Sequence, residues 1–98
     1  MAMCGKMGSI RKHVVINGKV QGVFFRSSAQ KRATSLGIGG WIKNMPDGKV
    51  EAVFEGKEEA VRKMLSWCWK GSGPAHVIDL KTKDEEPSGE EKDFRIKT

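Results

Sequence analysis

The chain has 98 residues, which suits one domain with a single core and leaves no room for a second. Hydrophobic residues make up 38% of it and charged residues 31%, and no apolar run is long enough to cross a bilayer. The polar start at residues 1–9 lacks the apolar stretch of a signal peptide. We therefore expect a soluble, cytoplasmic protein with no membrane partner, made of a disordered tail at 1–10 and a domain at 11–98.

Cysteine and histidine are the residue types that would support a disulfide or a metal site. Cys4 falls in the tail and Cys68 in a helical pattern, and neither has a histidine neighbour at the spacing of metal ligands. His13 and His76 fall in strand patterns, without partners at ligand or catalytic spacing. We interpret both cysteines as free thiols and both histidines as structural or solvent-facing, and we expect no metal.

Charge is unevenly distributed along the chain, whose net charge is +6. Residues 1–50 contain nine Lys or Arg and the single acid Asp47, so this half should attract anions. Six of the twelve acids lie between Asp84 and Asp93, around a Pro-Ser-Gly turn signal. That run is typical of a solvated loop and does not indicate a site.

The first half of the chain predicts a strand, a helix and the first arm of a hairpin. The β-branched run at 13–17 predicts a strand that ends at Gly18. Apolar or small residues at helical spacing predict a helix at about 27–36, which Gly37 ends. Segment 40–44 predicts the next strand, and the Pro-Asp-Gly signal after it predicts a tight turn.

The second half continues with a strand at 50–55, an amphipathic helix at 57–69, and extended segments at 75–83 and 93–97. In the strand at 50–55, Val50 and alternate residues form an apolar face, whereas Glu51 and Glu55 fall on a face expected to be wet. The predicted order is thus β-α-β-β-α-β plus a final strand. Two split βαβ units favour an α+β, ferredoxin-like sandwich, in which a mixed, largely antiparallel sheet carries both helices on one face.

The segment from Gly18 to Arg26, at the passage from the first strand into the first helix, is a candidate phosphate cradle. Its glycines permit tight turns, a helix start offers free N–H groups at the positive end of its dipole, and Arg26 can contact two phosphate oxygens. A plain connecting loop is the alternative. The segment is neither a Walker A motif nor a dinucleotide-binding fingerprint, so nucleotide binding gains no support.

A wider pattern of motifs is far more specific than this loop alone. The motifs are Gly18-x-Val20-Gln21-Gly22-Val23-x-Phe25-Arg26, Leu36-Gly37, Gly40-Trp41-Ile42-x-Asn44 and Asp47-Gly48-x-Val50-Glu51-Ala52. In that order and spacing they closely resemble the acylphosphatase family, from about Arg11 to the end at Phe94-Arg95-Ile96. The resemblance implies a hydrolase that acts on acyl phosphates and needs neither a metal nor another cofactor.

The resemblance also implies the site residues. The backbone amides expected to wrap the phosphate belong to Gly18, Lys19, Val20, Gln21, Gly22, Val23 and Phe24. Arg26 would neutralise the phosphate, and Asn44 would position the attacking water. No general base is required, because an acyl phosphate already has a good leaving group and a phosphate oxygen can accept the proton.

Two positions depart from the family pattern. Phe24 stands where the family usually has a small residue, and Ser72 replaces a common proline in a loop. We expect the Phe24 side chain to turn outward, because only its backbone N–H need face the phosphate. Altered substrate preference is the alternative for Phe24, and we attach no function to Ser72.

Two other functions compete with this interpretation. A basic ferredoxin-like sheet can bind RNA, but the first strand at 14–16 and the third at 50–54 lack the neighbouring exposed aromatics that this mode needs. Core packing explains Trp41, Trp67 and Trp69 better than base stacking does. Acylphosphatase-like modules also serve inside larger carbamoyl-transfer or hydrogenase-maturation proteins. We expect that role to be less suited to this chain, which stands alone. We expect a monomer that binds small acyl phosphates and anions but no nucleic acid.

Overall fold

The computed structural model describes residues 9–22, 24–71, 73, 75–89 and 93–97, which form two helices packed on one face of a sheet. Its elements are β1 (Ser9–Lys19), α1 (Phe25–Ser35), β2 (Gly39–Asn44), β3 (Val50–Lys57), α2 (Glu58–Lys70), β4 (His76–Glu85) and β5 (Phe94–Ile96). The sheet order is β4-β1-β3-β2-β5, and only β5 runs parallel to its neighbour among these strands. The expected ferredoxin-like α+β fold with an added C-terminal strand is confirmed.

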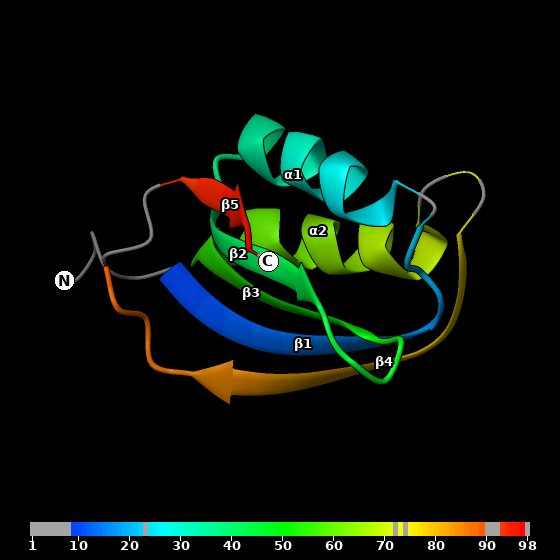
Figure 1. The fold of residues 1–98 in the computed structure, drawn as a ribbon. Coiled ribbons are helices and arrows are strands. Elements are labelled where there is room, and N and C mark those ends of the chain that lie inside the picture. Colours follow the sequence, from blue (N-terminus) through cyan, green and yellow to red (C-terminus); the bar gives the residue numbers. More distant parts are fainter. Residues whose placement is uncertain (1–8, 23, 72, 74, 90–92, 98) are drawn as a thin grey trace, which may run out of the picture.

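The core lies between the sheet and the two helices (Figure 1). Its buried residues are Val14, Ile16, Val20, Phe25, Ala29, Ala33, Ile38, Ile42, Val50, Ala52, Phe54, Val61, Met64, Cys68 and Phe94. They alternate along β1 and β3 and recur at helical spacing along α1 and α2, so the apolar face of these strands and the apolar faces of both helices are removed from water. Cys68 is among them as a free thiol, whereas Cys4 lies outside the described residues.

Strand β1 extends well beyond the predicted segment 13–17 and starts two residues before the predicted domain boundary at 11. The predicted strand began too late because the charged residues Arg11 and Lys12 do not fit an apolar strand pattern. Arg11 pairs with Glu55 at 2.8 Å and with Glu85 at 2.9 Å, and Lys12 pairs with Asp84. These neighbours on β3 and β4 make the charged end of β1 compatible with the sheet.

The alternation of β3 predicted that the sheet face opposite the helices is exposed to water, but part of that face is buried. Glu55 is buried there, with 7% of its surface exposed. Its carboxylate accepts hydrogen bonds from the backbone N–H groups of Ser88 and Gly89 and from the Ser88 hydroxyl, besides the Arg11 contact. Hydrogen bonds to Glu55 therefore hold the segment that follows β4 against the sheet at Ser88 and Gly89.

Strand β5 brings the end of the domain beside β2. Gly40 pairs with Phe94 and Ile42 with Ile96, and the Phe94 ring stacks on Phe54 at 5.4 Å between centroids. The Gln30 side chain of α1 donates to the Phe94 carbonyl at 3.0 Å, so α1 and β5 are tied together. This pairing places Ile96 next to the first turn of α1.

Candidate active site

The loop between β1 and α1 is shaped by backbone conformations that few residues accept. Gly18 has φ 138°, and a Cβ there would lie 2.1 Å from the His76 carbonyl oxygen, so only glycine fits. Gly22 has φ 73° and Phe24 has φ 62°. A left-handed conformation is uncommon for an aromatic residue, and here it sets the chain into α1.

Helix α1 begins without a conventional cap. Phe24 occupies the N-cap position, and among the described residues no side chain accepts a hydrogen bond from the first-turn N–H groups and no acid lies in that turn. Free N–H groups and the positive end of the helix dipole therefore face the same region as the loop. This arrangement suits an anion.

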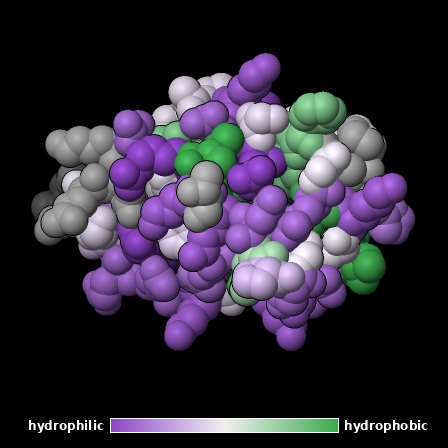
Figure 2. All heavy atoms as spheres, in the orientation of Figure 1, coloured by the Kyte–Doolittle hydropathy of each residue, from purple (hydrophilic) through white to green (hydrophobic). Residues whose placement is uncertain are grey.

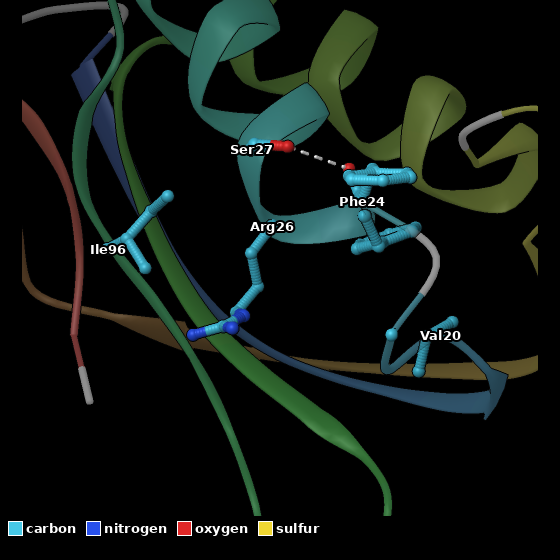
Figure 3. A pocket seen from close by; sticks show the side chains of 7 residues that line it. Val20, Phe24, Arg26, Ser27 and Ile96 are labelled. Atoms are coloured by element: carbon cyan, nitrogen blue, oxygen red, sulfur yellow. Dashed lines mark hydrogen bonds between the residues drawn. The ribbon is translucent and has the colours of Figure 1, made fainter.

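Arg26 is the second residue of α1 and is half-buried. Its side chain runs from the helix toward the sheet, with Phe24 and Val20 on one side and Ile96 on the other (Figure 3). Together with Gly22, Phe25 and Ser27 these residues line a pocket of about 260 Å³. Of the described residues that line it, Arg26 alone carries a charge.

Asn44 is the last residue of β2 and faces Val50 across the hairpin. It lies two residues after the core residue Ile42, so its side chain is on the helix-covered face of the sheet. Its Oδ1 is buried and accepts no hydrogen bond from any described residue. Because buried polar atoms are nearly always paired, this oxygen is suited to bind a donor supplied by a ligand or a water.

The Gln21 side chain joins the loop to the turn that follows Asn44. Its Nε2 donates to the carbonyl oxygens of Met45 at 2.8 Å and Lys49 at 2.9 Å. The turn is itself closed by a hydrogen bond from the Met45 N–H to the Lys49 carbonyl oxygen and by the Asp47 carboxylate, which accepts from the Lys49 N–H. That backbone hydrogen bond holds the pKa of Asp47 below its ordinary value.

The predicted site residues are thus only partly brought together in one pocket. Val20, Gly22, Phe24 and Arg26 line it, whereas Gly18, Lys19, Gln21 and Asn44 are not among its lining residues and Val23 lies outside the described residues.

Phe24 turns outward as expected, with 77% of its surface exposed. The sequence did not predict Ile96 as a pocket residue, because it reaches the pocket only through the pairing of β5 with β2. Nor did it predict that the Gln21 side chain binds the turn after Asn44, although the turn itself was predicted.

The remaining candidate residues take no part in this pocket. His13 Nε2 lies 2.7 Å from Glu51 on the open face of the sheet, and His76 is exposed. Trp67 packs on Phe25, Trp69 is half-exposed, and Trp41 lies beneath two lysine side chains.

Within the described ranges no three His, Cys, Asp or Glu side chains form a group that could hold a metal ion, and no helix is long and apolar enough to span a membrane. Ser72 lies outside these ranges.

Comparison with known proteins agrees with this geometry. The sequence model of the acylphosphatase family matches residues 12–96. An acylphosphatase of Roseiflexus sp. (strain RS-1) is 50% identical over 90 residues, which cover 92% of this chain and 97% of that protein.

Two solved acylphosphatase structures share the fold. That from Coxiella burnetii has a TM-score of 0.91 and 33% identity and covers 98% of this chain and 100% of its own. That from Bacillus subtilis has a TM-score of 0.87 and 30% identity, with 91% and 99% covered. The resemblance carried by the loop and hairpin motifs is thereby confirmed, and the chain belongs to the acylphosphatase family, whose activity is the hydrolysis of acyl phosphates.

Proposed function

We propose that this protein hydrolyses the carboxyl-phosphate bond of acyl phosphates in the pocket beside the start of α1, with Arg26 and Asn44 as its catalytic residues. The observation that carries the proposal is the position of Arg26. Its guanidinium belongs to a pocket formed by a glycine-bearing loop and an uncapped helix start, so charge and free N–H groups converge on one volume.

Arg26 binds the phosphoryl group and compensates its growing negative charge. A guanidinium is protonated at any working pH and offers two parallel donors, which match two phosphate oxygens. The backbone N–H groups of the loop from Gly18 to Phe24 complete the cradle. Donors whose positions are set by the fold before the substrate arrives need little reorganisation during the reaction.

Asn44 positions the water. Its Oδ1, which accepts no hydrogen bond within the described part of the chain, accepts one from the water, and this orients a lone pair of the water oxygen toward phosphorus. The new P–O bond forms as the bond from phosphorus to the acyl oxygen breaks, and the carboxylate leaves with the electron pair. One water proton passes to a phosphoryl oxygen, so no protein base is required and no metal enters the reaction.

The same proposal includes a monomer in the cytoplasm that binds no nucleic acid. Subcellular fractionation and the mass in solution test these two points. A membrane-bound or dimeric protein would contradict them.

Hydrolysis of benzoyl phosphate, followed by ultraviolet absorbance with and without a chelator, tests the function. We expect activity that the chelator leaves unchanged. Arg26→Ala should raise KM and lower kcat, and Asn44→Ala should lower kcat about 10²- to 10³-fold while inorganic phosphate still inhibits. Arg32→Ala is the matched control, because Arg32 is an exposed arginine on the same helix that does not line the pocket. Normal turnover by Asn44→Ala would remove Asn44 from the mechanism.

A further inference from the structure

Two of the exposed large hydrophobic residues lie at the same pocket. Among the described residues the exposed large hydrophobics are Phe24, Trp69, Ile78 and Ile96. Phe24 and Ile96 both line the pocket that holds Arg26, although they come from opposite ends of the domain. We call these two side chains the apolar rim. Figure 2 shows hydrophobic surface near the start of α1 and near β5 on one face of the molecule, with hydrophilic surface between them.

Phe24 combines an exposed side chain with an unusual backbone conformation. With φ 62° at the N-cap of α1, the residue leaves the loop in a left-handed conformation, and 77% of its surface stays in water. Such a conformation costs an aromatic residue free energy that glycine would not pay. Strain and exposed apolar surface together at the mouth of a pocket indicate a ligand contact.

The pocket has a charged part and an apolar part, which match the two parts of an acyl phosphate. Arg26 is its charged group, whereas Val20, Phe25 and the apolar rim supply apolar surface. The phosphoryl group takes the charged part. The acyl group, which departs on the side of phosphorus away from the attacking water, has the apolar rim available as apolar surface of the same pocket.

We propose that the apolar rim binds the acyl group and makes the enzyme select acyl phosphates with an aromatic or large apolar acyl group over those with a small one. This inference rests on the proposed function and adds the substrate class to it. Phe24 and Ile96 are specificity-determining residues, and an aromatic acyl group gains an offset or edge contact with the Phe24 ring.

The test compares kcat/KM for benzoyl phosphate and acetyl phosphate in the wild type and three variants. Phe24→Asn removes the ring while tolerating the left-handed backbone. Ile96→Ser removes the other half of the rim, and Ile78→Ser is the same substitution at an exposed isoleucine of β4 away from the pocket. The inhibition constant of inorganic phosphate reports separately on the phosphate cradle.

We expect the ratio of the two kcat/KM values to fall about three- to tenfold in Phe24→Asn and about two- to fivefold in Ile96→Ser, and to stay unchanged in Ile78→Ser. Inhibition by phosphate should stay within about twofold of the wild type in Ile96→Ser. If the wild type hydrolyses both substrates and neither rim variant changes the ratio, the inference is overturned and the proposed function stands. If the wild type hydrolyses neither, the proposed function fails.

Discussion

Gln21 offers a direct test of how the phosphate loop is held against the hairpin that carries Asn44. Its Nε2 makes two hydrogen bonds, to the carbonyl oxygens of Met45 and Lys49. Each such bond contributes about 1 kcal/mol net, so Gln21→Ala should lower the free energy of unfolding by about 1 to 3 kcal/mol. For a domain of this size that loss corresponds to a fall in Tm of roughly 5 to 20 °C.

The effect on catalysis should exceed the effect of instability. Without the link, the loop and Asn44 shift relative to each other, and a displacement on the order of 1 Å can cost about 10²-fold in rate. We expect kcat to fall at least about tenfold in Gln21→Ala at a temperature where the variant is fully folded. The kcat of Gln21→Glu should be lower still, because a carboxylate cannot donate a hydrogen bond and would face two carbonyl oxygens.

The assays are thermal unfolding by circular dichroism and steady-state hydrolysis of benzoyl phosphate. Gln30→Ala is the matched control, since Gln30 also donates to a backbone carbonyl, that of Phe94, and its hydrogen bond joins α1 to β5 rather than the loop to the turn. It should lose about half as much stability and keep its kcat. A Gln21→Ala enzyme with wild-type kcat and KM would refute the reasoning, whatever its Tm.

Three further predictions concern stability. Gly18→Ala should lower the free energy of unfolding by at least about 2 kcal/mol, because the new Cβ would overlap the His76 carbonyl. Gly37→Ala meets no such overlap and is strained only by its φ of 73°, so it should lower the free energy of unfolding by about 1 kcal/mol, and urea unfolding measures both values. Burial alone would raise the pKa of Glu55, but hydrogen bonds from Arg11, Gly89 and Ser88 hold it below the ordinary 4.5. The folded state thus binds fewer protons than the unfolded state, and the stability this gives at neutral pH is lost as the pH falls below about 4.5. Glu55→Gln should unfold more easily at pH 7 and lose less on acidification. Burial raises the pKa of the Cys68 thiol, so in a Cys4→Ser background a thiol reagent should label it only on unfolding, and labelling of the native protein would contradict its burial.

The sequence predicted those parts of the fold that depend on local periodicity. The apolar stripe of α2 and the alternation of Val50, Ala52 and Phe54 on β3 reappear as buried faces, because a residue's side depends only on its place in a helix or strand. The charged start of β1 and the burial of Glu55 could not be predicted in this way. Both depend on partners far along the chain that only the completed sheet brings near.

The site divides along the same line. Arg26 could be predicted, because a glycine-bearing turn before a helix start is a local arrangement with a physical meaning. Asn44 was predicted only through the family resemblance, and the structure showed that its buried oxygen accepts no hydrogen bond from the described residues. Ile96 carried no local signal at all, since its contact with the pocket requires β5 to pair with β2.

The left-handed backbone at Phe24 has an evolutionary consequence. In the proposed binding mode the phosphate is held by the N–H of this residue, while the side chain points to solvent. A substitution here can therefore change what the enzyme accepts without altering how it grips the phosphate. The conformation restricts the choice, because residues branched at Cβ are strongly disfavoured at positive φ whereas glycine and asparagine are tolerated. Position 24 is thus a place where new substrate preferences can arise by single substitutions drawn from a short list of residues.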